Sequence, residues 1–531
     1  MREISPHDLY DALRQGDTLA LLDVREHGEY NRAHIAGATA LPRRLIEQRL
    51  ARLVPFAGVR VVLYDDTGAR AALAARTLER MGYADVAVLA GGIMGWVTEG
   101  YPTEWGMNVP SKDFGERVEV RQHVPSIDAR ELRARIERGD EVVILDTRTP
   151  EEYRRACIPG GRNVPGGELA YRIGEIVADA PDATVVVNCA GRTRSIIGTR
   201  TLQRLGLPNV VGLKNGTSGW VLAGYQLEVG ADRDALPEPS PASRQLADRF
   251  ARRVAAEDGV TLLAVGALRD LMARATRETV YLVDVRTEQE FSAGHIPGFW
   301  WFPGGQAVQR ADDLVAVRTG HVVFCDDAIA RAAIAGSWFR QLGFPSVYAV
   351  DGGTAAWVAA GLELEAGMAE PEPFGLASAR ESVRHVPAAT VRDLLGMSAP
   401  PAAIFVGTSR EFAAGHPPGS RWVPRGWLEL RIEELIPDWT EPIVVIDTDE
   451  TGALLAARTL EGIGYHDVSV LAGGMRGWRA AGLPVEQGLS GIMESPDDVV
   501  PAGTDRSPAD MIEYLRWEEA LGAKYAEGGG T

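Results

Sequence analysis

The chain alternates between two patterns of hydrophobic and polar positions. Amphipathic segments such as Ile127 to Arg138 carry apolar residues at helical spacing, and short apolar runs such as Val142 to Leu145 are typical of buried strands. Only a few residues connect one segment to the next. This alternation predicts mainly parallel α/β sheets with helices on both faces.

One block of sequence returns four times along the chain. Its copies end in AGGIMGW, KNGTSGW, DGGTAAW and AGGMRGW, which close at Trp96, Trp220, Trp357 and Trp478. The period has the size of a domain and is too long for a solenoid repeat. Because 531 residues suffice for about that many domains, we predict four tandem domains of one kind.

Segments rich in Pro and acidic residues mark the predicted boundaries. Two of them lie at 231–243 and 366–373, and the stretch around Val109 to Asp113 is a weaker break. The predicted domains are 1–108, 120–232, 245–368 and 378–488, followed by a tail at 489–531. Within the tail, Ser507 to Ala526 is predicted to form one amphipathic helix that either docks onto a domain or binds a partner.

Composition and charge narrow the class of protein. Apolar residues make up 45% and charged residues 24% of the chain, which excludes disordered, collagen-like and disulfide-rich proteins. The formal net charge is −18, with Lys and Arg spread along the sequence, so we expect no nucleic-acid partner. We also expect no membrane span and no signal peptide. Three scattered cysteines favour a reducing, cytoplasmic location.

The recurring motifs resemble those of the rhodanese (thiosulfate sulfurtransferase) domain. The pattern runs from D-x-R through E-[YF]-x3-HI-x-G to a strand ending at a Cys position, a loop of Gly, Arg and Ser, and L-x-GG-x3-W. The copies extend from about Ile4 to about Glu486, which is similar to bacterial sulfurtransferases with four tandem rhodanese modules. The resemblance implies four rhodanese-like α/β domains and a helical C-terminal tail.

A single copy carries a cysteine at the strand end. Alignment on the helix that follows the loop places Asp65, Cys189, Asp326 and Asp447 at this position. Cys325 lies one residue earlier, on the alternate face of its strand, and should point into the sheet. We therefore predict one active site, in the second domain, and three inactive domains that serve as scaffold or binding surface.

The predicted active-site loop lies between a strand and a helix. Its catalytic residue is Cys189, and its predicted substrate-binding residues are Ala190, Gly191, Arg192, Thr193, Arg194 and Ser195. A thiolate attacks sulfur, and backbone amides, a helix N-terminus and cations favour the thiolate. Arg192 and Arg194 should attract an anion. Arg194 is favoured because Arg70 and Arg331 occupy its register in two other copies.

The resemblance implies a two-step reaction that needs no metal or organic cofactor. Cys189 takes the sulfane sulfur from a donor to form a persulfide, and cyanide, a small thiol or a protein thiol then removes it. Thiosulfate is the leading donor because two arginines suit a dianion and because CAGRTRS differs from the CGSG-like loop of 3-mercaptopyruvate enzymes. The physiological donor and acceptor and the oligomeric state stay open.

Two alternative functions come from other observations. A cysteine-based phosphatase or arsenate reductase resembles this fold, but its C-x5-R pattern needs an Arg where this chain has Ser195. A non-catalytic scaffold or interaction protein is suggested by the three copies that lack the cysteine. The intact CAGRTRS loop argues against that second alternative.

The D-x-R motif is interpreted as structural, with the Asp as a helix cap. The expected pairs are Asp23 with Arg25, Asp146 with Arg148 and Asp284 with Arg286. In the fourth copy FVGTSREF is two residues shorter than the third copy's segment, with Gly407 and Ser409 expected where the Asp and Arg would stand.

The histidines of the HI-x-G motif are interpreted as turn or interface residues rather than metal ligands, because no second ligand is suitably spaced. They are His34, His295 and His416. Cys157 replaces this histidine in the second copy. It is interpreted as a small packed residue, with a resolving cysteine as the alternative.

Overall fold

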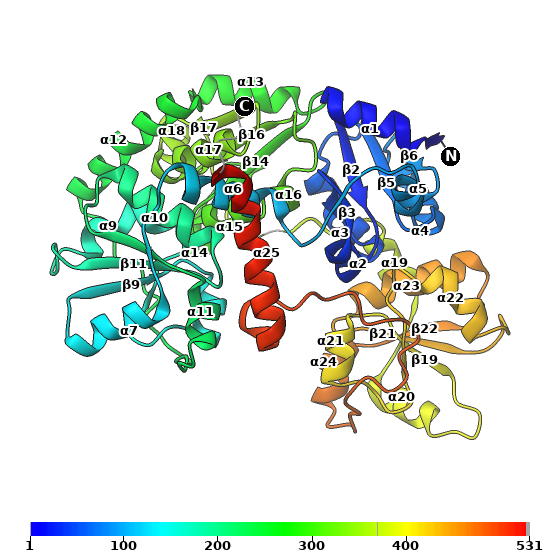
Figure 1. Cartoon of the computed structure of the whole chain (residues 1–531). Coiled ribbons are helices and arrows are strands. Elements are labelled where there is room, and N and C mark those ends of the chain that lie inside the picture. Colours follow the sequence, from blue (N-terminus) through cyan, green and yellow to red (C-terminus); the bar gives the residue numbers. More distant parts are fainter. Residues whose placement is uncertain (1, 369, 527–531) are drawn as a thin grey trace. The chain divides into compact units, whose positions relative to one another are not determined.

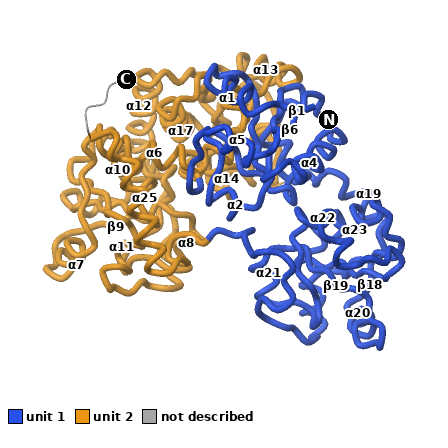
Figure 2. Tube along the Cα trace, turned by 45° about the vertical axis from the view of Figure 1, so that its right-hand side comes forward, with its two compact units in different colours: residues 1–107, 370–500 blue, residues 108–369, 501–531 orange. Residues whose placement is uncertain are grey.

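The computed structural model describes residues 2–368 and 370–526, and the chain divides into two compact units (Figure 2). One unit consists of residues 1–107 and 370–500, and the other of residues 108–369 and 501–531. The first and fourth modules thus share one unit, and the second and third modules share the other. The sequence repeat does not predict this grouping, because the first module shares a unit with the fourth module and not with the second, which follows it in the chain.

The unit of residues 1–107 and 370–500 contains the first and fourth modules (Figure 1). The first module consists of β1 (Arg2–Ile4), α1 (Pro6–Gln15), β2 (Leu19–Asp23), α2 (His27–Arg32), β3 (His34–Ile35), β4 (Thr39–Ala40), α3 (Ile46–Leu53), β5 (Arg60–Tyr64), α4 (Ala69–Arg80), β6 (Val86–Leu89), α5 (Gly92–Thr98) and β7 (Thr103–Glu104). The fourth consists of α19 (Leu376–Ser382), β18 (Arg384–Val386), α20 (Ala388–Leu395), β19 (Ala402–Phe405), α21 (Ser409–Ala414), β20 (Arg421–Trp422), α22 (Leu428–Leu435), β21 (Ile443–Ile446), α23 (Thr451–Ile463), β22 (Val468–Leu471) and α24 (Gly474–Ala480).

The other unit contains the second and third modules and the tail helix. The second module consists of α6 (Val109–Arg121), β8 (Ser126–Ile127), α7 (Ala129–Arg138), β9 (Val142–Asp146), α8 (Pro150–Arg155), β10 (Arg162–Asn163), α9 (Leu169–Ile176), β11 (Thr184–Asn188), α10 (Thr193–Leu205), β12 (Val210–Leu213) and α11 (Gly216–Leu222). The third consists of α12 (Pro241–Asp258), β13 (Thr261–Leu263), α13 (Val265–Arg274), β14 (Val280–Asp284), α14 (Glu288–Ala293), β15 (Trp300–Trp301), α15 (Gly304–Gln309), α16 (Ala311–Leu314), β16 (His321–Cys325), α17 (Ala330–Gln341), β17 (Ser346–Val350) and α18 (Gly353–Ala359). The tail helix is α25 (Pro508–Ala526).

Every module is built on a five-stranded parallel sheet with the same strand order (Figure 1). In the second module the order is β10-β9-β11-β12-β8, and all four strand pairs are parallel. The central strands of the four sheets are β5, β11, β16 and β21. The predicted fold class, four α/β modules with mainly parallel sheets, is confirmed.

Helices cover both faces of the sheet in the second module. Val185 and Val187 of β11 belong to a core with α9 and α10, which includes Leu202. Val186 belongs to the opposite core with α7 and α11, which includes Trp220. Because successive side chains of a strand point to opposite faces, one apolar run supplies both cores, and each buried Val or Leu contributes about 1.5–3 kcal/mol.

The predicted weak break at Val109 to Asp113 is the start of a helix instead. α6 begins with Val109 and Pro110, where proline suits the first helical turn, and it packs against α10 and α25. The hydrophobic pattern does not reveal α6, because the side chains that it buries include Lys112 and Glu116, residue types that are normally exposed.

The fourth module differs from the prediction at the D-x-R position. β19 pairs with β21 so that Phe405 lies beside Ile446, and this is the place that Asp284 holds in the third module. Phe405 and Gly407 therefore stand where the Asp and Arg would be, and the expected assignment to Gly407 and Ser409 with a two-residue deletion is wrong. Strand pairing sets the register here. The expected assignment instead matched Gly407 and Ser409 to the Asp and Arg of the other copies.

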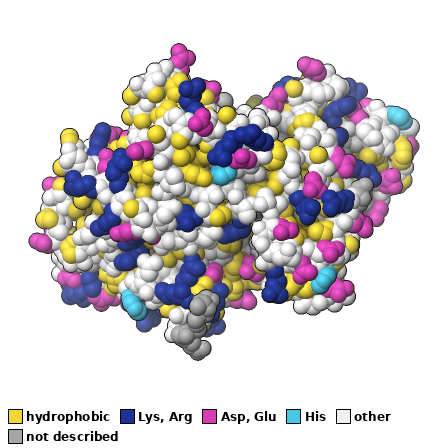
Figure 3. Space-filling view, turned by 90° about the horizontal axis from the view of Figure 1, so that it is seen from above, with side chains coloured by type: hydrophobic (Ala, Val, Ile, Leu, Met, Phe, Trp, Pro, Cys, Tyr) yellow, Lys and Arg dark blue, Asp and Glu magenta, His cyan; other side chains and the backbone are white. Residues whose placement is uncertain are grey.

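The tail forms the predicted helix, and it docks onto the second module. α25 lies along α6 (Figure 1), and its buried residues Met511, Leu515, Glu518 and Gly522 follow one face at helical spacing. On the face drawn in Figure 3, Lys and Arg side chains are interspersed with Asp and Glu side chains. Within residues 2–368 and 370–526, every helix is too short or too polar to cross a lipid bilayer.

Candidate active site

The candidate active site lies at the carboxyl end of β11, the central strand of the second module. Cys189 follows β11 directly, and residues 189–192 lead into α10. In open α/β sheets this is the edge at which loops converge and ligands bind. Cys189 is only 2% exposed, so its sulfur is enclosed by the residues around it.

A second loop supports the backbone of Cys189. Thr217 donates its N–H to the Cys189 carbonyl at 2.9 Å, and Ser218 donates to the Ala190 carbonyl at 3.1 Å. Gly216 has a φ of 53°, and a Cβ there would lie 2.1 Å from the Cys189 carbonyl oxygen. The other modules repeat this approach at Gly92, Gly353 and Gly474. In each module the glycine that begins the helix with the recurring tryptophan (Trp96, Trp220, Trp357 or Trp478) therefore positions the loop after the central strand.

The Cys189 thiol lies beside the first turn of α10. Its Sγ donates to Ser195 Oγ at 3.5 Å, and the Ser195 hydroxyl donates to the Arg192 carbonyl at 2.7 Å. Ser195 therefore links the sulfur to the turn that begins α10. The free N–H groups at a helix N-terminus favour a negative charge there.

The other three modules show that this loop conformation binds a carboxylate through backbone amides. The Asp65 carboxylate accepts from four backbone N–H groups, those of Thr67, Gly68, Arg70 and Ala71. Asp326 accepts from Ala328 and Arg331, and Asp447 from Thr448 and Gly452. The amides at the register of the Asp65 donors belong to Gly191, Arg192, Arg194 and Ser195. The second module thus places sulfur where its sisters place an anionic group in a nest of amides.

Burial affects the acids in these sister loops. Burial and the neighbouring Asp327 raise the pKa of Asp326, and burial raises the pKa of Asp447 to about 6. A carboxylate desolvated in this way is tolerated because backbone amides bind it. In the first, third and fourth modules the Asp carboxylate therefore fills the nest of backbone amides that its own loop forms.

Arg194 is buried and forms a bidentate pair with Glu152. Its Nη1 donates to Oε2 at 2.7 Å and its Nη2 to Oε1 at 2.9 Å. Burial opposes ionisation of Glu152, but Arg194 and the Thr149 amide bring the pKa of Glu152 down to about 2. Burial also disfavours the charged Arg194, yet Glu152 and then Cys189 raise its pKa.

The same pair recurs in two modules that lack the cysteine. Arg70 binds Glu29, and Arg331 binds Glu290, with bonds of 2.7–3.0 Å. This recurrence indicates that the pair first serves the fold, by joining the loop to the helix after the D-x-R turn. In the second module the same arginine stands five residues after Cys189.

Arg192 binds carboxylates of α6. Its Nε and Nη2 donate to Glu116 at 2.6 and 2.8 Å, Nη2 also contacts Glu119, and Nη1 lies 3.3 Å from Asn215 Oδ1. Burial raises the pKa of Glu116 to about 7 although Arg192 opposes this. The structure therefore brings Cys189 and Ser195 together, and it places Arg194 in the same first turn of α10. The Arg192 guanidinium lies in a salt-bridge network with α6.

The tail helix contributes residues to this site that sequence reasoning does not assign to it. Thr193 donates its hydroxyl to Glu518 Oε1 at 3.1 Å. A methyl group added at Gly191 would lie 3.4 Å from Glu518 Oε2, 3.9 Å from Leu515 and 4.0 Å from Tyr514. In the sequence, the apolar face of α25 indicates that this helix packs against something. It does not indicate which module the helix covers.

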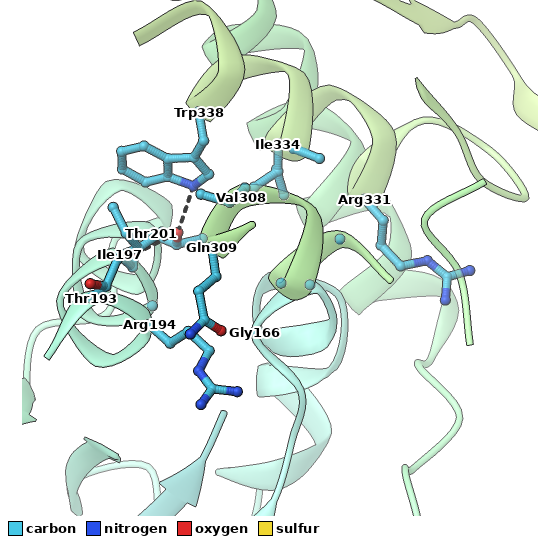
Figure 4. Close-up of a pocket in the computed structure, with 15 residues that line it drawn as sticks. Gly166, Thr193, Arg194, Ile197, Thr201, Val308, Gln309, Arg331, Ile334 and Trp338 are labelled. Carbon is cyan, nitrogen blue, oxygen red and sulfur yellow. Dashed lines mark hydrogen bonds between the residues drawn. The ribbon is translucent and has the colours of Figure 1, made fainter. Parts of the chain in front are cut away.

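A separate cavity lies between the second and third modules (Figure 4). Ile197 and Thr201 of α10 and Trp338 of α17 line it, and the Trp338 indole N–H donates to Thr201 Oγ1 at 3.2 Å. Arg194 and Arg331 also contribute to its lining. Its volume of about 30 Å³ has room for a water molecule or two and not for a sulfur donor.

The D-x-R pairs are confirmed, whereas the capping role of the Asp is not. Arg148 donates from Nε and Nη2 to the Asp146 carboxylate at 2.9 and 2.7 Å and from Nη2 to the Ala156 carbonyl at 2.7 Å. The N-cap of α8 is Thr149. The arginine instead fixes the turn after α8, and Arg25 and Arg286 do the same in their modules.

The HI-x-G histidines lie in short β-bridges rather than in turns: His34 begins β3, and His295 and His416 pair with Glu365 and Glu486. Each ring contacts the backbone carbonyl four residues earlier and stacks on the aromatic side chain there. Cys157 makes the corresponding backbone bridge to Glu228, with both hydrogen bonds at 2.8 Å. Burial raises the pKa of the Cys157 thiol, which suits a packed residue better than a resolving cysteine. Cys325 is buried in the core of its module, as expected.

Comparisons with known proteins agree with this architecture. A family model described as "Rhodanese-like domain" matches residues 5–99, 128–223, 266–360 and 393–481. The crystal structure of thiosulfate sulfurtransferase from Pseudomonas aeruginosa is similar with a TM-score of 0.89 at 36% sequence identity, and the match covers 99% of this chain and 98% of that one.

Two curated proteins of Mycobacterium tuberculosis match parts of the chain. The putative thiosulfate sulfurtransferase SseB is 26% identical over 271 residues, which are 44% of this chain and 90% of SseB. The probable adenylyltransferase/sulfurtransferase MoeZ is 39% identical over 101 residues, which are 19% of this chain and 25% of MoeZ. The chain therefore spans about a quarter of the length of MoeZ.

Proposed function

Because the chain belongs to the rhodanese-like domain family, we propose that its second module is a sulfurtransferase that moves the sulfane sulfur of thiosulfate through a persulfide on Cys189 to cyanide or a thiol. One observation carries the proposal: Cys189 places a thiol at the position where three sister loops bind a carboxylate through backbone amides. The names of the Pseudomonas aeruginosa enzyme and of SseB support thiosulfate as the donor.

In the first step the Cys189 thiolate attacks the outer sulfur of thiosulfate. A new S–S bond forms at Cys189, the S–S bond of thiosulfate breaks, and its electron pair leaves with sulfite. The charge balances, because a thiolate and a dianion become a persulfide anion and a dianion. The amides of Gly191, Arg192, Arg194 and Ser195, at the register of the Asp65 donors, would then bind the terminal sulfur.

In the second step the acceptor attacks the terminal sulfur of the persulfide. Cyanide forms thiocyanate, or a thiolate forms a new persulfide, and the electron pair of the broken S–S bond returns to Cys189. Arg194 favours both anionic forms of the cysteine through its charge, and Glu152 holds its guanidinium in place. The backbone amides and Arg194 thus stabilise the negative charge of both the thiolate and the persulfide without changing their positions.

The intact mass of the protein after treatment with thiosulfate tests this proposal. We expect a gain of one sulfur atom, located at residue 189 by peptide mass, and release of thiocyanate on addition of cyanide. Cys189→Ser should lose both. Cys157→Ser and Cys325→Ser are matched controls that should keep both, because these thiols are buried away from the loop. Thiocyanate formation by Cys189→Ser at the wild-type rate would refute the assignment.

A further inference from the structure

The helix α25 covers the loop that carries Cys189. Leu515, Tyr514 and Glu518 all lie within about 4 Å of a methyl group placed on Gly191. Burial, Glu518 and then Cys189 raise the pKa of Tyr514. Ahead of the helix, a Cβ on Gly503 would lie 3.5 Å from Ala190 Cβ. These contacts place α25 and the segment before it against the two residues that follow Cys189, which is itself 2% exposed.

The group that α25 brings closest to Gly191 is the carboxylate of Glu518. Its Oε1 accepts from the Thr193 hydroxyl, whereas Oε2 has no hydrogen-bond partner among the residues that the structure describes. The side chain is 2% exposed, so this oxygen is buried and faces the loop. A buried carboxylate oxygen without a donor is energetically costly, and thiosulfate would bring two more negative charges beside it.

We propose that α25 is a movable lid over the Cys189 loop and that Glu518 is the group through which the closed lid excludes small anions. The anion part rests on the proposed function, whereas the covering of Cys189 does not. In the closed state the nest of amides is unavailable to thiosulfate because α25 occupies the approach over Gly191. Opening removes both the steric cover and the carboxylate, and the donor then reaches the sulfur.

The far end of α25 is held by an anchor that does not touch the loop. Asp113 of α6 pairs with Lys524 at 2.5 Å and accepts from the Tyr525 hydroxyl at 2.6 Å. Close packing supports this anchor, since a Cβ on Gly522 would lie 3.4 Å from Glu116 Cβ and 3.6 Å from Val120. The lid can therefore be loosened by a change remote from the cysteine.

The first experiment measures access to Cys189 in the full chain. Iodoacetamide is neutral, so its rate of alkylation at residue 189, followed by peptide mass, reports steric cover and needs no sulfur transfer. Asp113→Ala should raise this rate at least fivefold, and Asp113→Asn, which keeps the side-chain volume, should raise it in the same direction. Asp140→Ala is the matched control, because Asp140 pairs with Arg138 away from α25, and it should leave the rate unchanged.

The second experiment separates the effect of the Glu518 charge from the steric effect of α25. Glu518→Gln keeps an oxygen that can accept from Thr193, so its alkylation rate should match wild type while its KM for thiosulfate falls about tenfold. Glu513→Gln, on the exposed side of α25, is the control and should leave KM unchanged.

Each part of the proposal has an outcome that overturns it. Alkylation of both Asp113 variants at the wild-type rate, in proteins that melt as wild type does, would show that α25 is no lid. An unchanged KM in Glu518→Gln would show that Glu518 does not exclude the donor. If wild type and Glu518→Gln both fail to turn over thiosulfate while Asp113→Ala alkylates faster, the proposed donor is wrong and the lid stands.

Discussion

At the scale of single residues, the decisive feature is one position in the loop after each central strand. Three modules place a carboxylate there and one places a thiol, and the backbone amides that surround the position are shared. The sequence is enough to predict this contrast, because the helix after the loop fixes the register of Cys189. It could not reveal that Arg192 binds Glu116, because that contact joins residues far apart in the chain.

The pair of Arg194 with Glu152 predicts a pH dependence of stability. The pKa of Glu152 in the folded protein is about 2, below its ordinary value of 4.5. The pair therefore contributes its full stability above about pH 4.5 and loses it as the pH falls toward 2. We expect Glu152→Gln to be less stable than wild type by about 3 kcal/mol at pH 6.

Urea unfolding of both proteins between pH 6 and pH 3 measures this difference. The gap between wild type and Glu152→Gln should narrow steadily as the pH falls below about 4.5. Glu116 titrates in another window, since burial raises its pKa to about 7, and it affects both proteins alike. A gap that stays constant down to pH 3 would contradict the ion-pair explanation.

At the scale of elements, the sequence predicts what is local and misses what is tertiary. The amphipathic segment from Ile127 to Arg138 is observed as the helix Ala129–Arg138, and the strand from Val142 to Leu145 as Val142–Asp146. Both are specified by local periodicity. The helix α6 buries charged residues whose partners lie elsewhere in the chain, so its sequence carries no comparable signal.

The loop that supports Cys189 predicts the effect of a single methyl group. Gly216→Ala combines a φ of 53° with a contact of 2.1 Å to the Cys189 carbonyl oxygen. Gly224→Ala is a matched control, because its φ is 88° and nothing lies within 4 Å of the added Cβ. We expect the control to cost about 1 kcal/mol, and Gly216→Ala to cost at least about 2 kcal/mol more.

Thermal melting and the rate of sulfur transfer check this expectation. Gly216→Ala should lower Tm more than Gly224→Ala and should slow transfer at a temperature where both proteins are folded, because the Cys189 backbone must shift. Equal Tm and equal rates in the two variants would show that the Gly216 loop does not position the cysteine.

At the scale of the whole molecule, modules that are distant in sequence share a unit. In the unit of residues 1–107 and 370–500, Arg425 of the fourth module donates to Glu47 at 3.0 Å and to the Arg44 carbonyl at 2.9 Å in the first. Arg425 is 6% exposed. Burial opposes ionisation of Glu47, but Arg425 lowers its pKa overall. The second module, with Cys189, belongs to the other unit.

This division predicts that the two units can be destabilised separately. Arg425→Ala leaves Glu47 buried without its partner, which costs about 3–5 kcal/mol in such pairs, so calorimetry should show one transition at lower temperature and a second transition unchanged. Arg421→Ala, at an exposed position, is the control. Because Cys189 lies in the other unit, sulfur transfer by Arg425→Ala should stay at the wild-type rate below the first transition. A loss of transfer that tracks that first transition would mean that the unit containing Cys189 depends on the other unit for its activity.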